Sequence, residues 1–155
     1  MSPWPLRCGW GGIDGEERAL SEVVPERPLP VITGMNAYYW CGGADGRLHI
    51  LCCEDCGRFA HPYVGRCAAC HSKDMAPKAV SGRATVCGFT INHQPWFPHV
   101  PTPYVFAYVE LEEQASIRLS TNIVHCPVEE IRIGMPVKVL FEQHGDIFVP
   151  LFEPA

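Results

Sequence analysis

Two C-x-x-C pairs separated by ten residues stand in the stretch CCEDCGRFAHPYVGRCAACHSKD, residues 52–74. Cys53 and Cys56 form the first pair, and Cys67 and Cys70 form the second. Pairs at this spacing can bring four thiolates to one tetrahedral zinc ion, with Zn–S distances of about 2.3 Å. A segment of roughly 25 residues cannot bury enough apolar surface to fold, whereas a structural zinc site supplies about 10–16 kcal/mol. The spacing therefore predicts a rubredoxin-like zinc ribbon.

Each of the two predicted metal-binding turns is followed by a residue that tolerates a positive φ. Gly57 follows the first cysteine pair and His71 follows the second. Glycine adopts this conformation without strain, and histidine adopts it more readily than most residues. Four sulfur ligands leave no open position on the ion, so the predicted metal is structural rather than catalytic. The same ligands would also suit a rubredoxin-type iron site, and a redox-active pair of dithiols is a further alternative.

The other cysteines are interpreted as structural side chains. Cys52 directly precedes Cys53, and side chains alternate along a strand through LHILCC, so only one of the two can face the metal. Cys53 gives the two-residue spacing and Cys52 does not. The remaining cysteines, which we interpret as small apolar side chains, are Cys8, Cys41, Cys87 and Cys126.

The composition is that of a globular protein. The chain has 155 residues, of which 47% are hydrophobic and 19% are charged, and its net charge is −5. This charge argues against a general affinity for nucleic-acid backbones or anionic membranes. No apolar run approaches the roughly 18–20 residues that span a bilayer, and residues 1–30 lack the pattern of a secretory signal. We therefore expect a cytoplasmic protein, in which clustered cysteines are metal ligands more often than disulfides.

The sequence divides into four regions. Residues 1–30 contain five prolines and four glycines without periodicity, which predicts an extended or mobile tail. Residues 31–47 predict a short helix of about two to three turns, with Thr33 as its N-cap and a glycine-rich stop. Residues 48–76 form the predicted zinc ribbon, and residues 78–155 form a second module.

The second module shows the patterns typical of β-strands in five segments. These segments cover residues 83–91, 104–111, 117–124, 137–141 and 147–152, and one helical turn is predicted between the third and the fourth. Five short strands with this insertion predict a mainly β fold, a Greek-key barrel of the OB type. An immunoglobulin-like sandwich would need about seven strands. Gly82 and Gly88 suit the sharp coiling of the first barrel strand.

One face of the second barrel strand is a candidate binding surface. It carries Tyr104, Phe106 and Tyr108. Aromatic rows on OB folds stack single-stranded bases, but they also pack on other proteins. From Lys78 onward, five basic residues stand against eight acidic ones, and this net charge of −3 is poorly suited to following phosphates. We therefore favour burial against the ribbon or a partner over nucleic-acid binding.

The loop INHQPWFPHVPTPY, residues 91–104, is the second candidate surface. Its four prolines stiffen the backbone, so that holding Trp96 and Phe97 in place costs little conformational entropy. A stiff loop with large aromatic side chains favours an interface anchor. The alternative is a lid that folds back over its own end of the barrel. We interpret His93 and His99 in this loop as exposed or structural, because no carboxylate or nucleophile stands beside them.

Motifs for catalysis do not emerge. The sequence has no G-x-S-x-G, no glycine-rich phosphate loop and no histidine pair at helical spacing. His125 and Cys126 are adjacent, but adjacent side chains usually diverge in space. A small cysteine-dependent enzyme is therefore a weakly supported alternative.

The order of these parts resembles one family. A short aromatic helix, a ribbon beginning near CEDCGRFAHP, an SGRATV strand and a TNIV…EEIRIGMPVKVLFE segment are similar to the zinc-ribbon/OB-fold family known as domain of unknown function thirty-five (DUF35). The resemblance covers about residues 30–155. Members of this family look like accessory subunits, or fused domains, of thiolase-superfamily enzymes that act on acyl-CoA thioesters. Cys52 and His125 depart from the residue types common at their positions.

The resemblance implies a non-catalytic subunit with structural zinc on Cys53, Cys56, Cys67 and Cys70. Its barrel and helix would dock a thiolase-like subunit, such as a sterol-carrier-protein-like thiolase or a retro-aldolase that shortens steroid side chains. A MaoC-like hydratase is a possible further partner. The residues expected to contact the partner are Trp96, Phe97, Tyr104 and Phe106. We expect no nucleic-acid and no membrane partner, with a single-strand nucleic-acid binder as the principal rival function.

Overall fold

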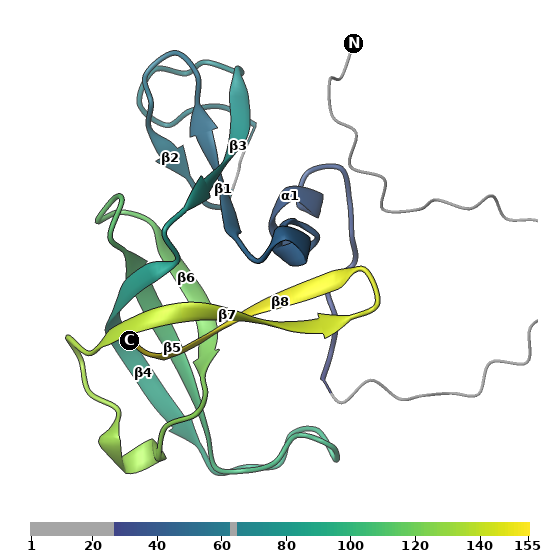
Figure 1. Ribbon diagram of the computed structural model, residues 1–155, viewed down its shortest axis with the longest axis vertical. Helices are drawn as coiled ribbons and strands as arrows, with labels where there is room; N and C mark the ends of the chain where they lie inside the picture. Colours follow the sequence, from purple (N-terminus) through teal and green to yellow (C-terminus); the bar gives the residue numbers. More distant parts are fainter. Residues whose placement is uncertain (1–26, 63–64) are drawn as a thin grey trace, which may run out of the picture.

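The computed structural model describes residues 27–62 and 65–155 of the chain. These residues form a small three-stranded sheet and a closed five-stranded barrel, and a short helical segment packs beside them (Figure 1). The fold is thus mainly β, as the sequence predicts. Most of the predicted tail, residues 1–26, lies outside the described residues. Within the described ranges, no helix is long and apolar enough to cross a membrane.

The helical segment is shorter than predicted. It consists of α1, Ala37–Trp40, followed by a 3-10 helix, Gly42–Asp45. The predicted N-cap was wrong, because Asn36 occupies that position and its Oδ1 accepts a hydrogen bond of 2.7 Å from the backbone N–H of Thr33. Thr33 therefore lies in the turn before the helix. Two consecutive glycines follow α1, and their low helix propensity explains why the α-helix ends after one turn.

The small sheet forms the ribbon. Its strands are β1, Leu48–Cys53, β2, Phe59–Ala60, and β3, Met75–Val80, in the order β2-β1-β3 with both pairings antiparallel. β3 pairs with β1 along its whole length, from Met75 opposite Cys53 to Val80 opposite Leu48. The sequence analysis did not predict β3 as a strand. Its Pro77 fits an edge strand, where a missing backbone N–H does not interrupt the sheet.

The barrel consists of the five predicted strands. They are β4, Arg83–Asn92, β5, Tyr104–Leu111, β6, Arg118–Ile123, β7, Pro136–His144, and β8, Ile147–Pro154. The strand order is β4-β5-β6-β8-β7, and β4 pairs with β7 to close the barrel. The predicted helical turn is the 3-10 helix Val128–Glu130, between β6 and β7. The pairing of β4 with β5 shifts register between Val86 and Gly88, an irregularity of the kind that increases strand twist, next to one of the two glycines for which sharp coiling is predicted.

The barrel closes unevenly. β7 and β8 pair over eight residue positions, from Val137 opposite Pro154 to His144 opposite Ile147. By contrast, β6 and β8 are parallel and share one ladder position, Ile123 opposite Phe152. Next to this position, the buried hydroxyl of Thr121 donates a hydrogen bond of 3.0 Å to the carbonyl oxygen of Pro150. A side chain therefore supplements the backbone pairing at this seam.

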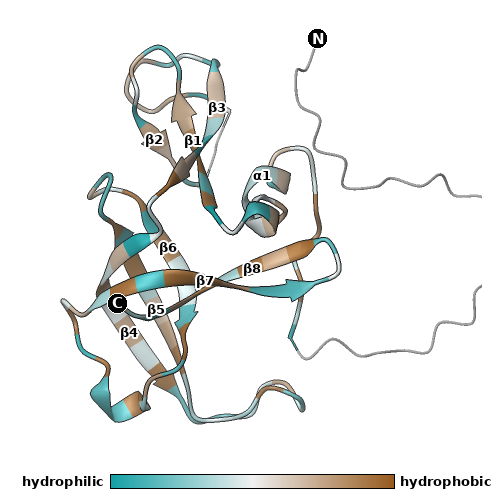
Figure 2. Cartoon of the chain, in the orientation of Figure 1, coloured by the Kyte–Doolittle hydropathy of each residue, from teal (hydrophilic) through white to brown (hydrophobic). Residues whose placement is uncertain are grey.

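One apolar core runs from the barrel into the base of the ribbon. Apolar and polar bands alternate along the barrel strands (Figure 2), as expected for strands with one buried face. The core joins barrel side chains to Leu48 and Ile50 of β1 and to Tyr38 and Tyr39 of α1. The base of the ribbon is therefore packed on the barrel core.

Candidate metal centre and docking surface

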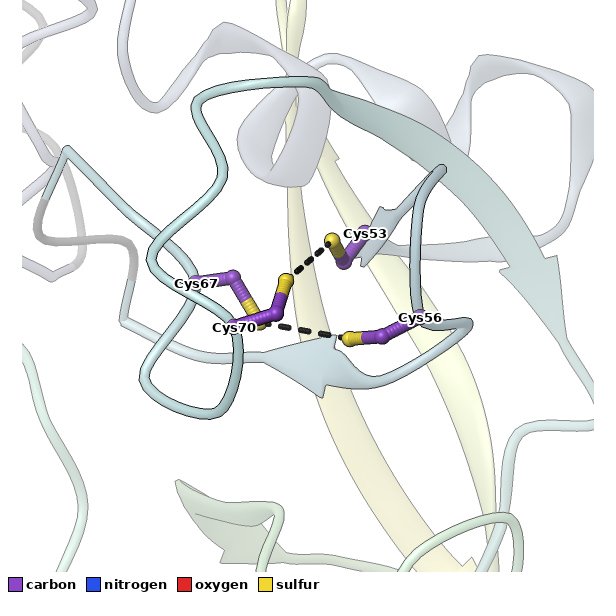
Figure 3. A group of neighbouring side chains, drawn as sticks. All are labelled: Cys53, Cys56, Cys67 and Cys70. Atoms are coloured by element: carbon purple, nitrogen blue, oxygen red, sulfur yellow. Dashed lines mark hydrogen bonds between the residues drawn. The ribbon is translucent and has the colours of Figure 1, made fainter.

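Four cysteine thiols meet at the far end of the ribbon (Figure 3). Cys53 ends β1, Cys56 lies in the turn that follows, and Cys67 and Cys70 lie in a second turn before β3. All four Sγ atoms lie within 4.8 Å of one another, with Sγ–Sγ distances of 3.5 Å for Cys53–Cys70 and for Cys56–Cys67. Four sulfurs bound tetrahedrally to zinc would be about 3.8 Å apart. The cluster therefore fits a tetrathiolate metal ion.

The two turns that carry these thiols have the same backbone geometry. In the first, the N–H of Gly57 donates to the carbonyl of Cys53 at 2.8 Å, and Gly57 has a φ of 72°. In the second, the N–H of His71 donates to the carbonyl of Cys67 at 3.0 Å, and His71 has a φ of 62°. The positive φ predicted for both residues is confirmed. The N–H groups of Arg58 and Ser72 in turn bond to the sulfurs of Cys56 and Cys70, the pattern that stabilises thiolate ligands.

The thiols are electrostatically unequal without a metal ion. Hydrogen bonds from the backbone N–H groups of Cys70 and Ala69 lower the pKa of Cys67 to about 6. The N–H of Arg58 also lowers the pKa of Cys56, but hydrogen bonds shared with the thiols of Cys67 and Cys70 outweigh it and raise that pKa to about 12. Four neighbouring thiolates repel one another, so a cation is required for all four to lose their protons together.

Cys52 faces away from the cluster, as the alternation along β1 predicts. Its side chain is buried, and its Sγ lies 3.3 Å from the carbonyl oxygen of Gly57, to which it donates a hydrogen bond. Cys52 therefore supports the turn that carries Cys53 and Cys56, on the side away from the thiol cluster. Of the other cysteines, Cys41 is buried and Cys87 donates to the carbonyl of Tyr108 at 3.2 Å. Cys8 lies outside the described residues.

The second barrel strand presents the predicted aromatic face. Val105, Ala107 and Val109 of β5 are buried in the barrel, whereas the alternating side chains point outward. Phe106 and Tyr108 on this outer face are 38% and 51% exposed, and their rings meet edge to face at 5.8 Å. The ribbon therefore does not cover this part of the barrel.

The proline-rich loop presents the other predicted aromatics. Trp96 is 69% exposed, and its indole N–H donates to Oδ1 of Asn92 at 3.0 Å. Phe97 is 46% exposed, and it lines a cavity of about 380 Å³ together with Tyr104 and Phe106. The structure thus brings Phe97, Tyr104 and Phe106 together, whereas Trp96 projects from the loop without lining this cavity. We call these four side chains the aromatic surface.

The histidine and cysteine suggested for catalysis do not pair. His125 instead bonds to Glu153, with 2.6 Å between Nδ1 and the carboxylate oxygen. Burial raises the pKa of the Cys126 thiol, with a further contribution from the charge of Glu130, and a raised pKa disfavours the nucleophilic thiolate. His93 and His99 are both exposed. This arrangement gives Cys126 no activating base.

Gln114 joins the two modules, a role that the sequence did not reveal. This residue follows β5, and its side-chain amide bonds to both backbone groups of Phe59 in β2. Its Oε1 accepts from the Phe59 N–H at 3.0 Å, and its Nε2 donates to the Phe59 carbonyl at 3.1 Å. The side-chain amide thus makes the two hydrogen bonds that the backbone of a neighbouring strand would make with Phe59. A glutamine in a polar turn carries no pattern from which this contact could be read.

Comparison with known proteins identifies the family. The model of the family described as "ChsH2, C-terminal OB-fold domain" matches residues 77–142. A solved chain titled "Ltp2-ChsH2(DUF35) aldolase" superposes with a TM-score of 0.74 and 33% identity, covering 81% of this chain and 98% of that one. The chain belongs to the DUF35 family. This DUF35 protein is also 32% identical to a "DUF35 domain-containing scaffold protein" of Methanothermobacter thermautotrophicus, over 59% of this chain and 68% of the relative.

Two larger relatives are subunits of hydratases. A "Probable enoyl-CoA hydratase alpha subunit" of Thermomonospora curvata is 35% identical over 83% of this chain and 40% of its own length. The "3-oxo-4,17-pregnadiene-20-carboxyl-CoA hydratase alpha subunit" of Mycobacterium tuberculosis is 31% identical over 77% of this chain and 37% of its own length. The chain therefore spans about two fifths of the length of these relatives.

Proposed function

We propose that this DUF35 protein is a non-catalytic subunit that docks on and supports an enzyme acting on acyl-CoA thioesters. The similarity to a DUF35 chain solved as an aldolase carries this proposal, because it covers 98% of that chain. The scaffold name of one relative and the alpha-subunit names of two others also describe components of assemblies. The partner enzyme would supply the nucleophile and the base.

The partner is a thiolase-like subunit in this proposal. The family resemblance suggests a sterol-carrier-protein-like thiolase or a retro-aldolase of steroid side chains, and the aldolase title of the similar structure supports the second. The steroid name of the mycobacterial relative supports a steroid acyl-CoA as the substrate class. Because both larger relatives are named as hydratase subunits, a MaoC-like hydratase is a reasonable third component.

The metal of the proposal is a structural zinc ion held by Cys53, Cys56, Cys67 and Cys70. Their Sγ separations suit tetrahedral Zn–S bonds, and the two turns direct the backbone N–H groups of Arg58 and Ser72 at the sulfurs of Cys56 and Cys70. Zinc bound by four sulfurs has no open position for substrate, so it would hold the ribbon in shape and take no part in the reaction.

The aromatic surface is the proposed contact with the partner. Exposed tryptophan and phenylalanine side chains on a stiff loop gain contact area at a small entropic cost, which is typical of interface anchors. Trp96, Phe97 and Phe106 are all substantially exposed in the isolated chain. The outward position of Trp96 supports the anchor interpretation over a lid closed on its own barrel.

The first experiment identifies the partner and the activity. A tagged chain should co-purify with a thiolase-superfamily protein, and acyl-CoA turnover should require that protein. Turnover by the purified chain alone would instead support a cysteine-dependent enzyme. Salt-dependent retention on single-stranded oligonucleotides, with micromolar affinity, would support the nucleic-acid alternative.

The second experiment tests the contact. Trp96→Ala should weaken the complex with the thiolase-like subunit by at least about 2 kcal/mol, the loss typical of a hot-spot aromatic. Its zinc content should not change. Ile133→Ala is the matched control, because Ile133 is also 69% exposed but lies on another loop. A lower melting temperature of the isolated Trp96→Ala chain, with unchanged partner affinity, would show that the loop is a lid.

A further inference from the structure

A basic hollow lies where the ribbon meets the barrel. Its volume is about 360 Å³, and the proposed docking contacts do not include it. The ribbon contributes Arg58, His61 and Arg66 to its wall, and the turn between β5 and β6 contributes Gln114 and Ser116. Three ribbon residues with nitrogen-bearing side chains therefore line one hollow.

No carboxylate of the described residues offsets the charge of the two arginines in this hollow, although Cys67 of the thiol cluster also lines it. Arg58 and Arg66 are both exposed, and neither forms an ion pair with a carboxylate in the described part of the chain. Arg66 donates one hydrogen bond, from Nη1 to the carbonyl of His71 at 3.2 Å. Across residues 27–62 and 65–155, the wall of the hollow includes no aspartate or glutamate. Both guanidinium groups therefore keep N–H donors that no carboxylate of the described residues accepts.

His61 adds a fixed donor beside the two arginines. Its ring packs against Tyr39 with 4.7 Å between the ring centroids, which holds it in one orientation. Its Nδ1 is buried and has no hydrogen-bond partner among the described residues. An N–H left without an acceptor is costly when buried, so the proton is more stable on Nε2. The favoured tautomer thus keeps its N–H on the nitrogen that is not buried.

We propose that this hollow binds a phosphate group of a small molecule, such as a phosphate monoester. Guanidinium groups donate paired hydrogen bonds to phosphate oxygens, and two arginines match the charge of a phosphate dianion. A volume of about 360 Å³ is larger than a single phosphate requires, so it leaves room for the group that carries the phosphate. The competing explanation is that both arginines merely offset the negative charge of a zinc tetrathiolate.

The test is a titration of the zinc-loaded full-length chain with inorganic phosphate, followed by the NMR signals of the arginine side chains and the His61 ring. Saturable shifts are expected in the wild type. Arg58→Gln and Arg66→Gln should each weaken phosphate binding by about tenfold. Lys73→Gln is the matched control, because it removes the same charge from an exposed ribbon residue that does not line the hollow. Zinc content is measured for every variant.

A variant on the barrel side keeps the test decisive if an arginine change disturbs the ribbon. Ser116→Asp places a carboxylate at the hollow without changing any ribbon residue, and it should abolish phosphate binding while zinc is retained. The proposal is overturned if phosphate shifts do not saturate, if Lys73→Gln weakens binding as much as the arginine variants, or if the arginine variants lose zinc while Ser116→Asp still binds phosphate.

A parallel titration with acetate tests whether the hollow prefers a phosphate group or a carboxylate. Acetate binding as tight as phosphate binding would identify a site for a carboxylate of a partner protein and overturn the phosphate assignment. Because these measurements need no partner enzyme, a negative result leaves the proposed subunit function intact.

Discussion

The barrel and the far end of the ribbon are held together by different means. In the barrel, alternate residues of β5 and β6 are buried in a continuous apolar core. In the far end of the ribbon, Cys67 is the one buried residue among the described positions 54–62 and 65–74. An apolar core stabilises through area removed from water, whereas this segment has no such core and carries three of the four clustered thiols. We therefore expect the two regions to depend on different sources of stability, an apolar core in the barrel and a bound metal ion at the far end of the ribbon.

The largest expected effect is on the ribbon. Cys67→Ser removes one of four ligands, so the purified chain should lose its zinc, about one ion per chain in the wild type. Residues 54–62 and 65–74 should then lose their structure, because no apolar core replaces the metal. Elemental analysis and amide hydrogen exchange measure the two effects. Cys87→Ser is the control, since Cys87 lies in β4 of the barrel. Full zinc retention by Cys67→Ser would refute the assigned ligand set.

The second expected effect is on the barrel. Leu119→Ala empties a fully buried position in β6 and should lower the free energy of unfolding by about 2–5 kcal/mol. The zinc bound per folded molecule should stay the same, because the metal centre is formed by other residues. Urea denaturation and zinc analysis of the folded fraction provide the measurements. If zinc is lost in parallel with this destabilisation, the two sources of stability are not independent.

A smaller effect is expected at the junction. Gln114→Ala deletes both hydrogen bonds to Phe59, at a cost of about 1–3 kcal/mol. Both modules should stay folded while their relative orientation becomes less defined, which residual dipolar couplings would detect. Ser116→Ala serves as a control that removes only the contact between Gln114 and the serine hydroxyl. Unchanged couplings in Gln114→Ala would mean that the shared core alone orients the ribbon.

The smallest effect is expected for Cys52, whose hydrogen bond supports the turn that carries Cys53 and Cys56. Cys52→Ala removes the hydrogen bond to the Gly57 carbonyl and should cost less than about 1.5 kcal/mol. The expected result is faster zinc release to a chelator with little change in barrel stability. Cys52→Ser, which keeps a donor at this position, should release zinc more slowly than Cys52→Ala. Equal rates for the two variants would assign Cys52 to packing alone.

The sequence predicted those parts that follow from local rules. The spacing of the cysteines, the residues after each pair and the period of two along β5 all depend on neighbouring positions, and the structure agrees with them. β3 could not be predicted in the same way, because MAPKAV forms a strand only through its pairing with β1. The short α1 has the same explanation, since packing of Tyr38 and Tyr39 into the core, and not helix propensity, stabilises it.

The candidate sites also differ in whether neighbouring residues or distant residues form them. The thiol cluster is encoded within eighteen residues, Cys53 to Cys70, whereas the basic hollow combines ribbon residues such as Arg58 and Arg66 with Gln114 of the barrel. A side-chain contact such as that between Gln114 and Phe59 depends on two surfaces meeting, which a single sequence does not reveal.

The single ladder position between β6 and β8 gives the barrel a preferred place to open. A closed sheet normally has no edge, but here β6 and β8 are joined by one ladder position and by the hydrogen bond of the Thr121 hydroxyl. Thermal fluctuations that break these contacts would convert the closed barrel into an open, curved sheet. The longer pairings of β7 with β8 and of β4 with β5 would remain intact. We therefore expect the backbone hydrogen bonds between β6 and β8 to open more often than those between β7 and β8.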